Sequence, residues 1–200
     1  MMLPLACLLS ACAPHRPASV SAVSGDVAKA TDLCRAETAK AFDLIQQKKY
    51  AEAEPILKRA IEADSMYGPA HNDLGLVYYR INRPYEAAWE FENAIKLMPK
   101  QPEPRNNLGL VLENADKLTQ ALPSFTQAAQ LDPANPEYLG NLARVRIRLG
   151  MRDDETKQIL ESLIDHDKRP EWIHWARYML IRLQGPKIED APTTAPSAVK

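Results

Sequence analysis

The chain has 200 residues, of which 46% are hydrophobic and 26% are charged, as in an ordinary folded protein. Its 25 lysines and arginines nearly balance its 26 aspartates and glutamates. A general nucleic-acid-binding protein usually carries a clear basic excess, so we expect no nucleic-acid partner. No apolar run reaches the roughly 18 residues of a transmembrane helix, and only 7 glycines are present, which argues against a glycine-rich phosphate loop.

The N-terminus begins with a short apolar stretch that ends at a cysteine. Residues 1–11 form a short apolar stretch that ends in leucine, serine and alanine directly before Cys12. This order resembles the lipobox, which implies that residues 1–11 are a signal peptide and that Cys12 carries the lipid. With Ala13 next, rather than aspartate, the resemblance further implies the outer membrane, facing the periplasm. No basic residue precedes the apolar stretch, which departs from the pattern, and the alternative is an apolar N-terminus with an incidental cysteine.

Residues 12–31 follow this signal and are small and polar, so we expect a flexible tether between the lipid and a domain at 32–184. Residues 185–200 are rich in proline and small polar residues, which predicts a disordered tail. The 3 cysteines do not form an even set, and the 4 histidines are scattered. The sequence therefore predicts no disulfide framework, no metal site and no cofactor.

The middle of the chain repeats with a period of about 34 residues. The residues that recur in one register are Leu74, Gly75, Ala87, Phe91, Ala94 and Pro99, followed by Leu108, Gly109, Ala121, Phe125, Ala128 and Pro133. Period and residue types resemble the tetratricopeptide repeat. The resemblance implies an all-α, right-handed superhelix of about four helix-turn-helix repeats and a C-terminal capping helix. The expected repeats are 34–67, 68–101, 102–135 and 136–169, with the capping helix at 170–184.

The repeated residues have physical reasons. Gly75 and Gly109 lack a side chain, which allows the two helices of each repeat to cross closely. In the repeat of Gly75, Phe91 fills the space between the two helices. Pro99 and Pro133 cannot continue a helix, so each ends its repeat.

The family resemblance places the binding surface on the concave face, which the first helix of each repeat lines. A protein or peptide partner is expected there. The groove positions of the family fall in this chain on Asn72, Asp73, Leu76, Tyr79, Arg80, Asn106, Asn107, Leu110, Glu113, Asn114, Glu137, Asn141, Arg144, Ile147 and Arg148.

Three of these residues, Asp73, Asn107 and Asn141, recur at the repeat period. They resemble the asparagine ladder of the tetratricopeptide domain of O-GlcNAc transferase, which holds a peptide backbone through side-chain amides. Asp73 departs from that pattern because an ionised carboxylate cannot donate a hydrogen bond. The alternative is that asparagine is merely tolerated at this position.

Two further features have both a binding and a packing interpretation. The arginines of residues 144–152 could bind an acidic partner segment or a phosphate-bearing glycolipid, or they could form a solvated face balanced by acids at 153–155. Trp172 and Trp175 could form a binding platform, but they favour the packing of the capping helix.

Two histidines have acidic neighbours in the sequence. His71 lies near Asp73, and His166 lies between Asp165 and Asp167. No nucleophile, oxyanion-stabilising group or third ligand accompanies either of them, so we expect no catalytic site.

Together these features predict a non-catalytic adaptor of the cell envelope whose groove holds a segment of another protein. The layout resembles lipoproteins that assist assembly of a pilus or a secretion apparatus. The alternative function is a regulatory or substrate-presenting subunit that docks a cell-wall or envelope hydrolase.

Overall fold

The computed structural model describes residues 20–185, and the predicted signal peptide, Cys12 and the tail after residue 185 lie outside this range. The described residues form nine α-helices and no β-strand, so the prediction of an all-α fold is confirmed. The helices are α1 (Val20–Gln46), α2 (Tyr50–Ala63), α3 (Gly68–Arg80), α4 (Pro84–Leu97), α5 (Glu103–Asn114), α6 (Leu118–Leu131), α7 (Pro136–Arg148), α8 (Asp154–His166) and α9 (Pro170–Gln184).

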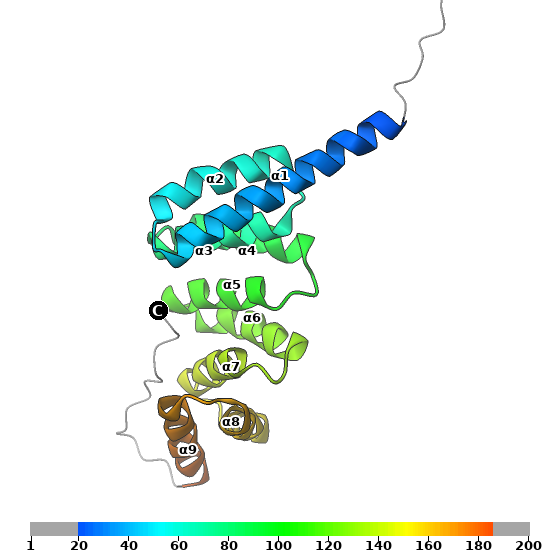
Figure 1. The fold of residues 1–200 in the computed structure, drawn as a ribbon. Coiled ribbons are helices and arrows are strands. Elements are labelled where there is room, and N and C mark those ends of the chain that lie inside the picture. The colour runs from blue at the N-terminus through cyan, green and yellow to red at the C-terminus, as the bar shows by residue number, and fades with distance from the viewer. Residues whose placement is uncertain (1–19, 186–200) are drawn as a thin grey trace, which may run out of the picture.

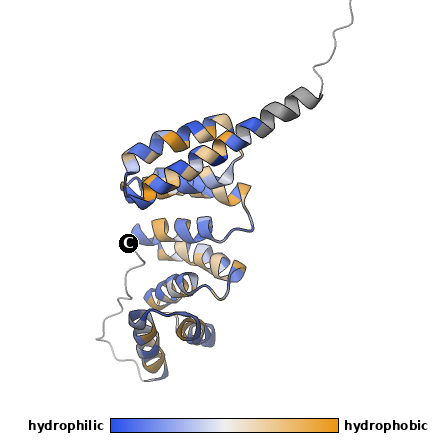
Figure 2. Cartoon of the chain, viewed as in Figure 1, coloured by the Kyte–Doolittle hydropathy of each residue, from blue (hydrophilic) through white to orange (hydrophobic). Residues whose placement is uncertain are grey.

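The helices form antiparallel pairs that stack along one axis, from α1 and α2 at one end to α9 at the other (Figure 1). Each helix packs against the next one in the chain, and α1, α3, α5 and α7 also contact one another in succession. Figure 2 shows apolar and polar residues on each pair, because every repeat buries one side against its neighbours and exposes the other. The result is a solenoid in which the first helices of the repeats line one face.

The turn inside each repeat has the same geometry in all four copies. Its residues with positive φ are Lys48 (60°), Asn82 (60°), Asp116 (56°) and Gly150 (74°). The next amide in each turn donates back to a carbonyl five residues earlier, as from Arg83 to Tyr78 at 2.8 Å. This is the left-handed ending of a helix, which glycine adopts most readily. Only the fourth copy has glycine there, so the residue types alone do not reveal the repetition.

The two helices of a repeat approach closely at a glycine, as predicted. A Cβ atom on Gly75 would lie 2.8 Å from the ring of Phe91, and one on Gly109 would lie 2.6 Å from the ring of Phe125. Both rings are completely buried. The glycine and the aromatic residue therefore form one packing unit.

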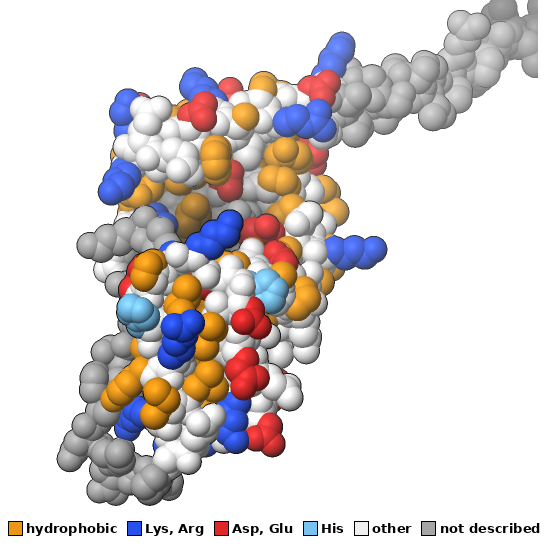
Figure 3. Space-filling view, turned by 60° about the horizontal axis from the view of Figure 1, so that its bottom comes forward, with side chains coloured by type: hydrophobic (Ala, Val, Ile, Leu, Met, Phe, Trp, Pro, Cys, Tyr) orange, Lys and Arg blue, Asp and Glu red, His pale blue; other side chains and the backbone are white. Residues whose placement is uncertain are grey.

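Helix α9 covers the last repeat with its two tryptophans. Trp172 packs on Gly140, where a Cβ atom would lie 2.8 Å from the ring, and it meets Trp175 edge-on with ring centroids 5.6 Å apart. Both side chains are buried, so packing and not a binding platform accounts for them. The outer side of α9 is not wholly polar, because Ile181 is 69% exposed. Figure 3 shows hydrophobic side chains among basic ones at this end of the solenoid.

One expected boundary is wrong. The sequence predicted a flexible tether up to residue 31, but α1 is already helical from Val20. Residues 20–31 contain no proline and several alanines. Once the packed part of α1 has nucleated, extending it needs no new nucleus, and no proline stops it, although Gly25 and the valines of this stretch are weak helix formers. Within residues 20–185, no helix has the combination of length and apolar character that a membrane span requires.

Candidate functional site: the concave groove

The groove face carries two rows of side chains that recur at the repeat period. Each row is apolar except for one charged residue. One row is Phe42, Leu76, Leu110 and Arg144, and the other is Ile45, Tyr79, Glu113 and Ile147. Phe42 is 49% exposed, whereas Leu76 and Leu110 are half-buried. The apolar part of the groove therefore belongs to α1, α3 and α5, and charged residues interrupt it between α5 and α7.

Hydrogen bonds between amides join the first helices of successive repeats. Asn107 donates to Asn72 at 3.1 Å between α5 and α3, and Asn141 donates to Asn106 at 2.8 Å between α7 and α5. Each pair is 35 residues apart, one more than the repeat period, because the sixth residue of one repeat meets the fifth residue of the preceding one. We call each such pair a rung.

The rungs change the interpretation of the predicted asparagine ladder. Asn141 and Asn106 are 1% and 2% exposed and use their amides on each other, so the expectation that Asn141 lies open to a partner is corrected. Asn106 also donates to Glu137 at 3.4 Å. Asn107 is half-buried and also engaged in a rung. These amides connect the repeats.

The equivalent residues between α1 and α3 are Thr38 and Asp73, which we call the first rung. No hydrogen bond joins their side chains within residues 20–185. The hydroxyl of Thr38 is buried, and within residues 20–185 it has no hydrogen-bond partner. Asp73 is half-buried and accepts one hydrogen bond, from the amide of its neighbour Asn72 at 3.3 Å. Burial raises the pKa of Asp73 from its ordinary value of 3.8 to about 6, although the hydrogen bond from Asn72 opposes the shift.

Ion pairs join α5 and α7 in the second half of the groove. Glu113 on α5 accepts from Arg144 at 2.8 Å and from Arg148 at 3.1 Å, both on α7. Arg148 also reaches Asp116 at 2.8 Å. Glu113 and Arg144 are only 7% and 8% exposed. The charges of this region are therefore paired within the solenoid, although Nη1 of Arg144 has no hydrogen-bond partner among residues 20–185.

The other arginines of this region face elsewhere. Arg146 turns away from the groove to Thr156, Asp153 and Glu155, and Arg152 donates to the carbonyl of Arg182 at 2.8 Å. The basic run read from the sequence is thus divided between two sides of α7. Of the groove residues that the sequence predicted, the exposed ones are Arg80, Asn114, Glu137 and Arg148.

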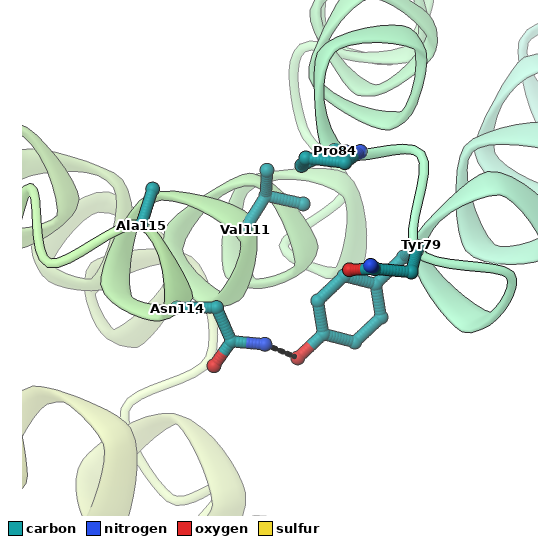
Figure 4. A pocket seen from close by; sticks show the side chains of 6 residues that line it. Tyr79, Pro84, Val111, Asn114 and Ala115 are labelled. Carbon is teal, nitrogen blue, oxygen red and sulfur yellow. Dashed lines mark hydrogen bonds between the residues drawn. The ribbon is translucent and has the colours of Figure 1, made fainter.

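A small hollow lies beside the groove between α3 and α5 (Figure 4). Its volume is about 120 Å³, and Tyr79, Pro84 and Val111 line it. Asn114 donates to the hydroxyl of Tyr79 at 2.7 Å, which fixes the ring at the edge of the hollow. The hollow could accept one small side chain of a bound segment.

The two histidines that have acidic neighbours in the sequence find other partners. His71 pairs with Glu90 at 2.7 Å and with the carbonyl of Ser65 at 3.1 Å, and the hydrogen bond with Glu90 raises its pKa. His166 contacts the carbonyl of Ser162 at 2.8 Å. Within residues 20–185, no group of three or more metal-ligating side chains occurs.

Burial raises the pKa of the Cys34 thiol, which donates to the carbonyl of Ala60 at 3.0 Å.

Asp73→Asn is expected to stabilise the protein in a pH-dependent way. Because the folded chain binds the proton of Asp73 more tightly than the unfolded chain, the free energy of unfolding falls as the pH rises from about 4 to above 6. At pH 8 the variant should gain about 1–2 kcal/mol, after discounting the half-exposed carboxylate. At pH 4 the gain should vanish. Urea unfolding at both pH values measures this.

The matched control for this prediction is Asp165→Asn on α8, whose carboxylate is exposed. It should change the free energy of unfolding by less than about 0.5 kcal/mol at either pH. An equal gain for Asp73→Asn at pH 4 and pH 8 would contradict the assignment of the effect to ionisation.

The comparisons with known proteins agree with this geometry. Family models of the tetratricopeptide repeat match residues 38–102 and 102–135. The chain is a tetratricopeptide-repeat protein. The matches cover the first three repeats, and the fourth tetratricopeptide repeat follows from the helices α7 and α8. No curated protein matches the sequence significantly.

Solved structures with the same fold include other tetratricopeptide proteins. The structure reported as a functional characterisation of Pseudomonas aeruginosa pilF has a TM-score of 0.68 and 19% identity, over 78% of this chain and 71% of that chain. YrrB, described as a tetratricopeptide protein with an unusual peptide-binding site, has a TM-score of 0.63 and 21% identity, over 74% and 76%.

The Thermobaculum terrenum O-GlcNAc transferase also has the same fold in one part of its chain. Its TM-score is 0.61 at 18% identity, over 68% of this chain and 26% of that chain. At identities this low, all three likenesses establish the tetratricopeptide fold alone.

Proposed function

We propose that this chain is a lipid-anchored adaptor of the bacterial envelope that holds a segment of a partner protein in the first half of its groove. The observation that carries the proposal is the contrast between the two halves. Between α1 and α5 the groove offers Phe42, Leu76 and Leu110 with partly exposed apolar surface. Between α5 and α7 the charged groups are already paired. An extended or helical segment gains most by covering apolar side chains that water otherwise contacts.

The finer role is assistance in assembling an envelope complex such as a pilus or a secretion apparatus. The fold likeness to the pilF structure supports this role, as does the resemblance of residues 9–12 to a lipobox. A lipid on Cys12 would hold the adaptor at the outer membrane, and the long helix α1 would extend the groove away from its anchor.

The experiment introduces charge into the apolar row. The double variant Leu76→Arg with Leu110→Arg should lose the partner that the wild-type chain captures from its native envelope, because each arginine replaces apolar contact surface. The matched control is Leu131→Arg on the outer helix α6, where the side chain is 41% exposed. All variants are first checked for an unchanged helical circular dichroism spectrum.

The identity of the captured protein separates the two functions. A component of a pilus or secretion apparatus supports the assembly role, whereas a cell-wall hydrolase supports the docking alternative. A partner retained by the double variant and lost by Leu131→Arg would contradict groove binding.

The lipid anchor has its own test. Cys12→Ser should move the chain from the membrane fraction to the soluble fraction and abolish labelling by radioactive palmitate. Ala13→Asp should keep the lipid and shift the protein from the outer to the inner membrane. A wild-type chain that takes up no palmitate would contradict the anchor without affecting the proposal for the groove.

A further inference from the structure

The three rung positions of the groove differ in how they are satisfied. Between α3 and α5, and between α5 and α7, an asparagine amide donates to an asparagine oxygen. Between α1 and α3 the equivalent residues are Thr38 and Asp73, and no hydrogen bond joins them in the described part of the chain. In the first rung, therefore, the partly exposed carboxylate of Asp73 stays available, whereas the hydroxyl of Thr38 is buried.

Both groups of this rung are costly to leave without partners. The hydroxyl of Thr38 belongs to a residue that is 6% exposed, so water reaches it poorly. Asp73 is half-buried, and its single hydrogen bond comes from a neutral amide. Glu113, by contrast, receives two arginines in the same groove. Buried carboxylates normally find a cation or several donors, and Asp73 has neither among residues 20–185.

The surroundings of the rung define what can fill it. One turn further along the two helices lie Phe42 on α1 and Leu76 on α3, both apolar and in part exposed. Arg80 is exposed two turns beyond Asp73 on the same helix, about 10 Å away at 1.5 Å per residue. A bound segment therefore meets a carboxylate, then apolar surface, and then a positive charge that disfavours a second cation.

We propose that the segment held in the groove places a lysine or arginine side chain on Asp73 and apolar side chains on Phe42 and Leu76. This inference rests on the proposed function, since it names the chemistry of the segment that the groove holds. Charge complementarity carries it, because a cation satisfies the carboxylate and the apolar stem of lysine or arginine lies on the neighbouring rings and methyl groups.

The probe is a phage-displayed library of random dodecapeptides, selected on the full chain in detergent. The selected peptides should contain lysine or arginine next to apolar residues more often than the unselected library. The best peptide is then synthesised in two forms, one with its lysine or arginine and one with norleucine in that place, and binding is measured by fluorescence polarisation.

A double-mutant cycle gives the decisive comparison. Replacing the basic residue by norleucine should weaken binding to the wild-type chain about tenfold, which corresponds to about 1.4 kcal/mol. Asp73→Asn should weaken binding of the basic peptide by a similar factor and leave the norleucine peptide almost unchanged. Because Asp73→Asn is expected to stabilise the fold, unfolding cannot explain a loss of binding. Asp165→Asn should bind both peptides as the wild type does.

The possible failures are distinguishable. Selected peptides without basic residues, or equal weakening of both peptides by Asp73→Asn, would overturn this inference while leaving groove binding intact. If the selected peptides bind Leu76→Arg with Leu110→Arg as tightly as the wild type, or if the wild type selects none, groove binding itself fails and the inference with it.

Discussion

Phe125→Ala is expected to lower the free energy of unfolding by about 3–5 kcal/mol. The ring is completely buried between α5 and α6 and lies directly over Gly109. Gly109 has no side chain that could fill the space left by the ring. The third repeat also connects the two halves of the solenoid, so its loss should uncouple them. Urea unfolding followed by circular dichroism should then show a broader or two-step transition.

Gly109→Ala tests the same contact from the opposite side. The added methyl group would lie 2.6 Å from the ring of Phe125, which forces the helices apart and should cost about 1–3 kcal/mol. Combined with Phe125→Leu, the cost of Gly109→Ala should shrink, because the smaller side chain leaves room for the methyl group. Gly185→Ala is the matched control, since its methyl group would meet its nearest atom at an ordinary 3.6 Å. Additive costs would show that Gly109 and Phe125 do not act as one unit.

Glu113→Gln is expected to lower the free energy of unfolding by about 2–4 kcal/mol. The substitution leaves the nearly buried Arg144 without its carboxylate, and Arg144 has no other ion pair within residues 20–185. Arg148 should suffer less, because Asp116 remains as its partner. The exposed Glu161→Gln on α8 is the matched control and should change stability by less than about 0.5 kcal/mol.

Replacing the whole pair should restore what Glu113→Gln loses. The replacements are taken from the same two rows of the groove. Leu110 lies in the row of Arg144, and Ile147 lies in the row of Glu113. Glu113→Ile with Arg144→Leu should therefore unfold within about 1 kcal/mol of the wild type or be more stable. A double variant as unstable as Glu113→Gln would contradict this account of the pair.

The sequence predicted the repeats well because their packing rests on residues that are hard to exchange. Gly109, Phe125 and Pro133 each meet a geometric demand that few other residues meet, so their spacing is visible in one sequence. The tryptophans of the capping helix were likewise interpretable as packing residues. The turns were less visible, since Lys48 and Asp116 adopt the same left-handed backbone as Gly150.

The groove was predicted only as a set of positions. The repeat period placed Asn141 correctly on the groove-lining helix α7, but it did not show that Asn106, 35 residues earlier, occupies its amide. That offset comes from the slant between neighbouring first helices, which is a property of the packed solenoid. The pair of Glu113 and Arg144 had a signal in the sequence, because opposite charges replace apolar residues in two adjacent rows. The first rung had no such signal in the sequence, since a threonine and an aspartate are common residues whose role depends on their surroundings.

The measurement that tests the central claim most directly is site-specific photo-crosslinking in the native envelope. A photoreactive amino acid is placed in turn at Phe42 and Leu76 in the groove, and at Tyr85 and Leu131 on the outer helices, where the side chains are 84% and 41% exposed. Both groove positions should crosslink to one segment of a single protein, and mass spectrometry should find a lysine or arginine in that segment. Crosslinks from Tyr85 and Leu131 without any from Phe42 and Leu76 would place binding on the outer face and contradict the account.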